Sequence, residues 1–298
     1  MDVPIPYLGE ALSLLSAVIW AFAVILFRKS GEKVHPLALN MFKNSLALVL
    51  FLPTIWLFGE TLLRPVPISS YTLLLLSGVI GIGIGDTFLF KSLNILGAGL
   101  TGIVICMYSP FIIILSVIWL GESLTMLQIM GAVLIISAVL IATLEKRNEQ
   151  IPRSNLLRGI LFGVVSSAAM AVGIVMIKPL LERSPLLWTS EIRLLGGALS
   201  LGLILLFHPA RRRIIDSLIS THSWGYTITG SFTGAYLALV VWLAGMKYTQ
   251  ASVASALNQT GTIFIFIFAG LLLKEPINLR RTIGIILAVI GVFLVFFG

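Results

Sequence analysis

The sequence predicts an all-α membrane protein with ten transmembrane helices arranged as two inverted five-helix repeats. Two observations support this fold class. Of the 298 residues, 58% are hydrophobic and only 11% are charged, which is far from the mixture found in soluble domains. The second half of the chain also repeats the pattern of the first. A soluble domain of this length could not bury so much apolar surface, so the lipid bilayer must serve as its solvent.

Ten apolar runs follow one another along the chain, separated by short breaks that contain turn formers or charges. Each run is about 20 residues long, which is enough to span a bilayer as a helix. The runs lie at about 7–27, 36–58, 71–93, 99–120, 124–144, 155–178, 186–207, 222–247, 251–273 and 279–297. They are longer than membrane strands and lack the alternation of a barrel, so each predicts a helix.

The two halves correspond residue by residue over long stretches. Residues 96–139 align without a gap on residues 249–292, so that Phe111 corresponds to Phe264, 153 positions later. Because each half has five spans, an odd number, the second half must enter the membrane from the opposite side. Many secondary transporters build alternating access from such inverted repeats.

The domain organisation follows from this repeat. We expect a first repeat at 1–147 and a second at 148–298, joined by the polar stretch 145–155. The apolar runs take up nearly all of the chain. A soluble catalytic domain therefore has no room in it.

The net charge of +8 does not indicate a nucleic-acid binder. The basic residues lie in short clusters at the ends of spans, as in cytoplasmic loops of membrane proteins, and do not form a continuous basic face. Most of them follow the odd-numbered spans. The charge count therefore predicts that both termini lie outside the cytoplasm.

Charged residues occur inside two corresponding spans. The second span has Asn40, Lys43 and Asn44 on one helix face, and the seventh has Glu191 and Arg193 at similar depth. Burying an ionisable side chain at the depth of the membrane core costs roughly several kcal/mol unless it faces a cavity or a partner. We expect these residues to line a cavity. The alternatives are snorkelling of Lys43 and Arg193 towards the interface, and a merely neutralising ion pair for Glu191.

The third span carries a carboxylate next to a run of glycines. Asp86 follows Gly78, Gly81, Gly83 and Gly85, and glycines allow close helix approach or local unwinding. Asp86 is therefore a candidate to hold a substrate ammonium group or a coupling proton. The alternatives are a salt bridge to Lys43 or Lys91, or a helix end at the interface.

Irregular midspan positions recur in both halves. In the fourth span Tyr108 and Pro110 interrupt an aliphatic run, and the corresponding part of the ninth span follows Asn258 and Gln259. Equivalent interruptions in two repeats point to a shared central site. The alternative is that these polar residues form hydrogen bonds between helices. Trp20, Tyr236 and Trp242 lie within spans and are candidates to stack on a solute, with packing an equal alternative.

Several junctions carry the features of a known family. They are Leu120-Gly121-Glu122, Leu273-Lys274-Glu275, and the stretch from Lys247 to Ser252. In these the chain resembles the drug/metabolite transporter superfamily, specifically its EamA-type members, over nearly its whole length. The first-half counterpart, Lys91 to Gly97, lacks the tyrosine and threonine found at 248 and 249.

The resemblance implies ten helices around a central cavity and transport of amino acids, other metabolites or drugs, commonly outward. For many relatives it also implies cytoplasmic termini, opposite to the charge count. It says almost nothing about the substrate.

We therefore expect a secondary transporter of small organic solutes, exporting amino acids or related metabolites, in the plasma (inner) membrane. The candidate substrate-binding residues are Trp20, Asn40, Lys43, Asn44, Asp86, Tyr108, Glu191, Arg193, Tyr236, Asn258 and Gln259. Lys43 and Arg193 would attract a carboxylate. Asp86 or Glu191 would bind an amine or a coupling proton, and the aromatic and amide side chains would orient the solute.

The expected partners are the solute, the lipid bilayer and a coupling proton or other ion, without nucleic acid, cofactor or metal. No phosphate-binding loop of an ATPase occurs in the sequence, which argues against an ATP-driven pump. The first alternative is a flippase for lipids or lipid-linked sugars, which aliphatic cavity walls and a lateral opening would favour. A membrane enzyme is the second, but the sequence lacks the usual hydrolase and metal motifs.

Overall fold

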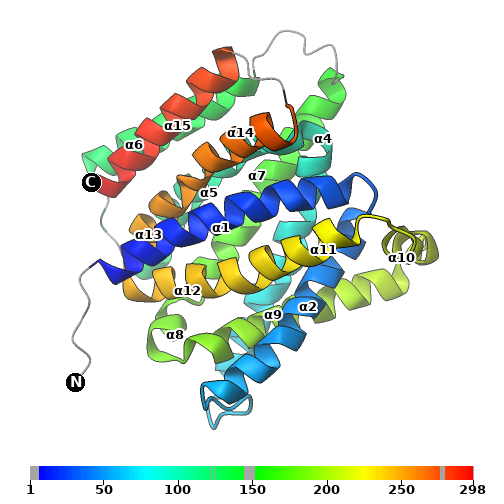
Figure 1. Cartoon of the computed structure of the whole chain (residues 1–298). Coiled ribbons are helices and arrows are strands. Elements are labelled where there is room, and N and C mark those ends of the chain that lie inside the picture. Colours follow the sequence, from blue (N-terminus) through cyan, green and yellow to red (C-terminus); the bar gives the residue numbers. More distant parts are fainter. Residues whose placement is uncertain (1–6, 122, 124, 144–151, 276–278, 298) are drawn as a thin grey trace.

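The computed structural model describes residues 7–121, 123, 125–143, 152–275 and 279–297, and all regular structure in this part of the chain is helical (Figure 1). Seven stretches of these residues are long and apolar enough to cross a membrane. One of them, Ile68–Leu120, is 53 residues long, too long for a single crossing, and it doubles back at Gly97. Two shorter apolar helices, Met126–Ala138 and Thr282–Leu294, complete the ten predicted spans.

The first repeat begins with α1 (Leu8–Gly31) and α2 (Pro36–Leu57). Its third span comprises α3 (Ile68–Gly78), the π-helical η1 (Val79–Asp86) and the first part of α4 (Thr87–Val104). The fourth comprises the rest of α4, the 3₁₀ turn η2 (Ile105–Met107), α5 (Tyr108–Leu115) and the π-helical η3 (Ser116–Leu120). The fifth span is α6 (Met126–Thr143).

The second repeat begins with α7 (Arg153–Val175), the short α8 (Lys178–Arg183) and α9 (Leu186–Phe207). A surface helix, α10 (Arg211–Ile219), precedes the eighth span, which comprises α11 (Trp224–Gly230), the π-helical η4 (Ser231–Leu237) and α12 (Ala238–Tyr248). The ninth span comprises α13 (Ala251–Gln259) and α14 (Gly261–Leu272), and the tenth is α15 (Leu279–Phe297). The predicted all-α fold with ten spans is confirmed.

The reversal between the third and fourth spans depends on Gly97. Its φ of 80° and ψ of 175° lie in a region that only glycine adopts readily. Directly after it, the backbone N–H groups of Ala98 and Gly99 donate hydrogen bonds of 2.7 and 2.9 Å to the carboxylate of Glu275. The junction motif of the second repeat thus caps a helix of the first. Its counterpart Glu122 lies outside the described residues.

Each repeat packs its first helix against the other repeat. A side-chain carbon added at Gly9 of α1 would lie 2.8 Å from Thr249, and one added at Gly159 of α7 would lie 2.6 Å from Leu96. Thr249 and Leu96 are equivalent positions of the two repeats, 153 residues apart. A glycine therefore allows the same close contact between the repeats in both halves, against backbone at Gly9 and against the Leu96 side chain at Gly159.

The two halves also share their helix irregularities. π-Helical segments, η1 and η4, occur in the third and eighth spans. In the fourth and ninth spans, α-helix is interrupted at Met107 and at Thr260, which are again 153 positions apart. The interruptions predicted in these two spans are present.

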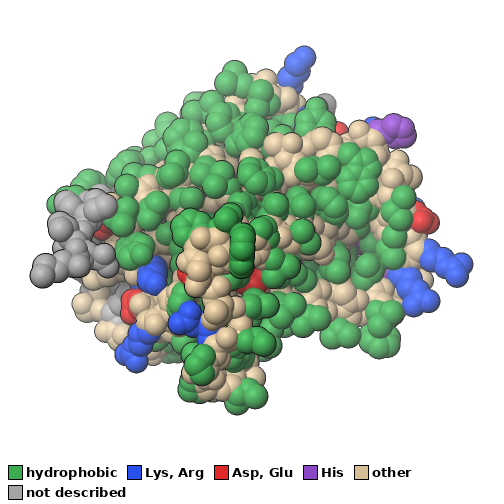
Figure 2. Space-filling view, turned by 60° about the horizontal axis from the view of Figure 1, so that its bottom comes forward, with side chains coloured by type: hydrophobic (Ala, Val, Ile, Leu, Met, Phe, Trp, Pro, Cys, Tyr) green, Lys and Arg blue, Asp and Glu red, His purple; other side chains and the backbone are tan. Residues whose placement is uncertain are grey.

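The outer surface is apolar over a broad face of the molecule. Figure 2 shows hydrophobic side chains over most of that face, with charged side chains mainly at its left and right sides and a few in its lower middle. In Figure 1, α6 and α15 pack side by side at one edge of the bundle, while α10 and α8 lie at opposite ends. Which end faces the cytoplasm stays a prediction.

Candidate functional site

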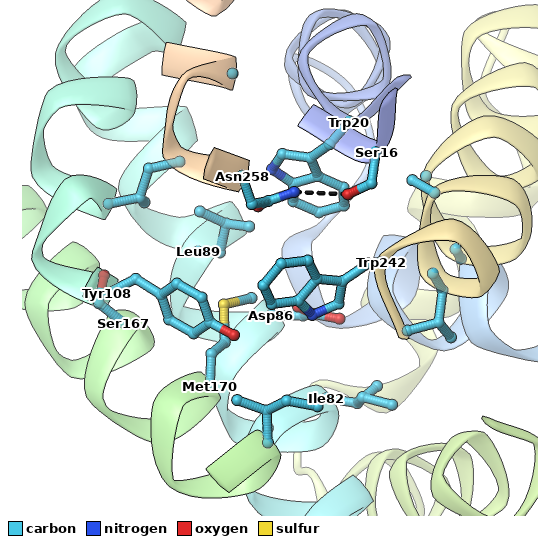
Figure 3. A pocket seen from close by; sticks show the side chains of 18 of the residues that line it. Ser16, Trp20, Ile82, Asp86, Leu89, Tyr108, Ser167, Met170, Trp242 and Asn258 are labelled. Atoms are coloured by element: carbon cyan, nitrogen blue, oxygen red, sulfur yellow. Dashed lines mark hydrogen bonds between the residues drawn. The ribbon is translucent and has the colours of Figure 1, made fainter. Parts of the chain in front are cut away.

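A central cavity of about 160 Å³ lies between the two repeats (Figure 3). Both repeats line it, through spans one to four of the first half and spans six to nine of the second. The interrupted segments are at its wall: η1 supplies Asp86, η2 and α5 supply Ile105 and Tyr108, and η4 supplies Gly234. The irregular backbone therefore surrounds the cavity, as it does at transporter binding sites.

The structure brings most of the sequence-predicted candidates together at this cavity. Those that line it are Trp20, Lys43, Asn44, Asp86, Tyr108, Arg193, Asn258 and Gln259. Asn40, Glu191 and Tyr236 are not among the lining residues. The role of each in binding a solute stays a prediction.

The lysine and the aspartate of the cavity form an ion pair. Lys43 Nζ lies 2.5 Å from Asp86 Oδ2 and also donates to Asn44 Oδ1 at 3.2 Å. Lys43 is 3% exposed and Asp86 6%, so both charges are inside the bundle. The salt bridge between Asp86 and Lys43, which was one alternative for Asp86 in the sequence analysis, is therefore present. It forms part of the cavity wall. Lys91 instead lies 4.9 Å from the ring centroid of Phe88.

Asn40 does not line the cavity but forms hydrogen bonds to residues that do. Its side-chain amide donates to the carbonyl of Ile82 at 3.0 Å and to Thr87 Oγ1 at 2.9 Å, and its oxygen accepts from Asn44 at 2.8 Å. Ile82 belongs to η1, where a π-helix leaves carbonyl groups out of the regular α-helical pattern. Asn40 thus holds the segment that presents Asp86 to Lys43.

Arg193 is a buried cation that has no carboxylate at ion-pair distance among the described residues, although the charge of Asp86 acts on it from farther away. Its Nε donates to Ser77 Oγ at 2.9 Å, and Ser77 in turn donates to the carbonyl of Gly173. The two terminal nitrogens of the guanidinium have no hydrogen-bond acceptor in the described part of the chain, although Arg193 is only 5% exposed. Ser77 holds one edge of the guanidinium and leaves the rest for the cavity.

Aromatic rings form the apolar part of the wall. Tyr108 and Trp242 lie with ring centroids 6.2 Å apart. Together with Trp20, which lies above them in Figure 3, they line the cavity. Tyr236 turns elsewhere: its hydroxyl forms a hydrogen bond with Thr54 Oγ1 at 2.6 Å, and its ring packs on Phe51.

The amides of the ninth span tie the two repeats together at the cavity. Asn258 donates to Ser16 Oγ at 2.6 Å, as Figure 3 shows, and Gln259 donates to the carbonyl of Ile105 at 3.0 Å. Ser16 and Ser167, which also lines the cavity, were not singled out from the sequence. Serine is common in membrane helices, so nothing in the sequence marked these two.

Glu191 is buried outside the cavity. It is 4% exposed, and its Oε2 has no hydrogen-bond partner among the described residues. It lies two positions before Arg193 on α9, which places the two side chains on different faces of the helix. The sequence left open that Glu191 forms an ion pair with Arg193. No such ion pair occurs among the described residues.

Comparison with known proteins gives consistent matches. The chain is 25% identical over 288 residues to an uncharacterized transporter of Archaeoglobus fulgidus, covering 95% of this chain and 96% of that protein. It is 33% identical over 136 residues to the uncharacterized transporter YetK of Bacillus subtilis, covering 42% of this chain and 38% of YetK. A protein of known crystal structure shares the fold with a TM-score of 0.73 at 18% identity, over 96% of this chain and 95% of that one.

The sequence profile of one family matches the chain twice, at residues 7–144 and again at residues 157–297. The two matches fall on the two five-span halves and together cover most of the chain. The protein is thus a multi-pass membrane transporter that belongs to the EamA-like transporter family.

Proposed function

We propose that this transporter is a secondary carrier of small organic solutes that bear a carboxylate, exporting amino acids or related metabolites through the central cavity. The observation that supports this best is the cavity itself, because equivalent interrupted segments of both repeats line it. Inverted repeats around a central site can expose that site alternately to the two sides of the membrane by exchanging conformations.

The cavity offers groups for each part of such a solute. Lys43 and Arg193 place two cations at its wall, and a cation inside the membrane is a strong attractor for a carboxylate. Trp20 and Trp242 supply flat apolar surface for a hydrocarbon side chain. Asn258 supplies a side-chain amide beside them, a polar group that can orient the solute.

The first experiment is a thermal-shift screen of the purified protein against amino acids, their deaminated analogues, nucleosides, sugars, lipophilic cations and lipids. A solute that binds the folded state raises the melting temperature, by an amount that grows with its concentration over its Kd. Solutes that stabilise the protein are then tested for exchange across the membrane of proteoliposomes.

Two variants make the screen specific for the cavity. Arg193→Gln removes a cavity cation, and Arg211→Gln removes a cation from the surface helix α10 as a matched control. We expect a carboxylate solute to stabilise wild type and Arg211→Gln but not Arg193→Gln. Stabilisation by lipids alone, with no exchange of any solute, would contradict the proposal and favour a flippase.

A further inference from the structure

We infer that the cavity selects solutes with one net negative charge, monocarboxylates with an aromatic body, over the corresponding zwitterionic amino acids, and that Arg193 binds the carboxylate. This inference rests on the proposed function. It narrows the proposed substrates, amino acids and related carboxylate-bearing metabolites, to the related metabolites that lack a charged amine, and it ranks the amino acids themselves below them.

The first argument is the charge balance of the cavity. Among the described residues that line it, the charged side chains are Lys43, Asp86 and Arg193. Lys43 and Asp86 neutralise one another across 2.5 Å. The three side chains therefore carry one net positive charge, and Arg193 is the cation with no carboxylate at ion-pair distance, although Asp86 also interacts with it over a longer distance. An unbalanced charge at membrane depth is unfavourable, so a monoanion that enters the cavity removes this penalty, whereas a zwitterion leaves the total unchanged.

The second argument is the geometry of Arg193. A guanidinium has five N–H donors in a planar fork that matches a carboxylate. The Nε–H is bonded to Ser77 Oγ, which leaves the terminal nitrogens without an acceptor in the described structure. Beside them stands Gly81, where an added side-chain carbon would lie 3.6 Å from Nη2. The missing side chain leaves space next to the donors.

The third argument concerns the amine of an amino acid. A buried ammonium needs an acceptor, and a carboxylate is the strongest one. The carboxylate of the cavity, Asp86, already accepts from Lys43. If a solute ammonium took Asp86, it would leave the Lys43 cation buried and unpaired, which is strongly unfavourable. Glu191 does not line the cavity, so it offers no substitute.

The rest of the wall suits an aromatic body. Trp20, Tyr108 and Trp242 provide three rings, and Met170 and Ile174 extend the apolar surface. Met170 lines the same cavity as Tyr108 and Trp242, and all three are labelled in Figure 3. Aromatic rings and a methionine sulfur favour contact with another ring. An aromatic monocarboxylate can therefore place its charge at Arg193 and its ring among these side chains.

Three probes with a common phenyl body test this charge selection. They are 3-phenylpropanoate, phenylalanine and 2-phenylethylamine, which carry one negative charge, no net charge and one positive charge. Binding to the full-length protein in lipid nanodiscs is measured by calorimetry. We expect 3-phenylpropanoate to bind at least about tenfold more tightly than phenylalanine, because burying an unpaired ammonium costs that much or more, and 2-phenylethylamine to bind least.

Variants test whether Arg193 causes the preference for a monocarboxylate. Arg193→Gln should weaken 3-phenylpropanoate binding about thirtyfold or more, as expected when a buried charged hydrogen-bond partner is removed. Ser77→Ala, which keeps the cation but frees its Nε edge, should weaken binding by a smaller factor. Each variant is first checked for a wild-type elution profile and helical content, so that a binding loss is read only from folded protein.

A gain of binding makes the test independent of misfolding. Asp86→Asn leaves Lys43 unpaired and gives the cavity a second unbalanced positive charge. This variant should bind the dicarboxylate phenylsuccinate at least about tenfold more tightly than wild type does. Misfolding cannot produce such a gain.

The inference is overturned if phenylalanine binds more tightly than 3-phenylpropanoate, or if Arg193→Gln leaves 3-phenylpropanoate binding unchanged. It is also overturned if none of the three probes binds while another solute from the screen is exchanged in proteoliposomes. In that last case the proposed transport stands and only the charge selection fails. Failure of every solute to exchange would remove the proposed function itself.

Discussion

The side-chain carboxylate of Glu275 accepts a 2.7 Å hydrogen bond from the backbone N–H of Ala98. A second bond, from the N–H of Gly99, has a length of 2.9 Å. The end of the ninth span is thereby fastened to the beginning of the fourth. A negative charge at a helix N-terminus is favourable both for its hydrogen bonds and for the helix dipole, so this contact stabilises the junction of the two repeats.

Removal of this contact should destabilise the protein. Glu275→Ala leaves two backbone N–H groups without their acceptor, at a cost of about 1–3 kcal/mol. Glu275→Gln keeps one acceptor oxygen and should cost less. Thermal unfolding of both variants in detergent measures the effect. Glu32→Ala, which removes an exposed carboxylate 3.8 Å from Lys29, is the control and should unfold like wild type. An unchanged melting temperature in Glu275→Ala would show that the contact contributes little.

The ion pair of the cavity should show strong coupling between its two members. Lys43→Met or Asp86→Leu alone leaves a buried charge unpaired and should destabilise by about 3–5 kcal/mol. The double variant removes both charges and should recover much of that loss, because an apolar pair can replace a buried salt bridge. A double-mutant cycle on unfolding free energies measures the coupling. Additive losses would mean that the two residues act separately.

The close approach of α3 and α9 should not tolerate a side chain at Gly78. An added carbon there would overlap the backbone carbonyl of Arg193, and backbone cannot move aside as a flexible side chain can. Gly78→Ala should therefore cost at least about 1–3 kcal/mol. At Gly225 an added carbon would meet nothing within 4 Å, and Gly225→Ala is the matched control. Melting temperatures of the two variants provide the comparison, and equal values would contradict the packing argument.

Stability should fall in mild acid because of His35, which lies between α1 and α2. Burial, with His208 and Lys91 nearby, lowers the pKa of His35 from its ordinary value of 6.5. Its Nδ1 accepts from the N–H of Leu37 at 3.2 Å, which requires the neutral ring. As the pH falls below 6.5, the unfolded chain binds a proton more readily than the folded one, so the folded state loses stability.

The variant His35→Asn tests this pH dependence. Asparagine keeps a side-chain oxygen for the helix cap but does not titrate. Between about pH 7.5 and about pH 5.5, a range around the ordinary histidine pKa, the melting temperature of wild type should fall further than that of His35→Asn. Parallel curves for the two proteins would exclude His35 as the cause.

The fold could be predicted from the sequence because its causes are local and repeated. Ten apolar runs of bilayer length predict the spans, and the constant offset of 153 positions between residues 96–139 and 249–292 predicts the repeat. The reversal at Gly97 was located only as a boundary between runs. Its cap comes from Glu275, 178 positions later, and no local pattern reveals a partner so distant.

The candidate site was predictable where a polar side chain interrupts an apolar helix. Lys43, Asp86 and Arg193 stand out for this reason, and all three line the cavity. It was harder to predict which face of a helix points into the cavity. The eighth span contains the π-helical η4, which shifts every later side chain around the axis, and Trp242 rather than Tyr236 lines the cavity.

The contacts at Gly9 and Gly159 have a consequence for how the protein is made. Helix α1 packs against α12 of the second repeat, and α7 packs against α4 of the first. Neither five-helix half can therefore bury the packing faces of all its helices by itself. During synthesis α1 stays without its main neighbour until more than two hundred further residues have been inserted. The whole chain, and not the duplicated half, is therefore the unit that reaches the native state, and a gene cut at the linker would yield fragments that depend on one another in the membrane.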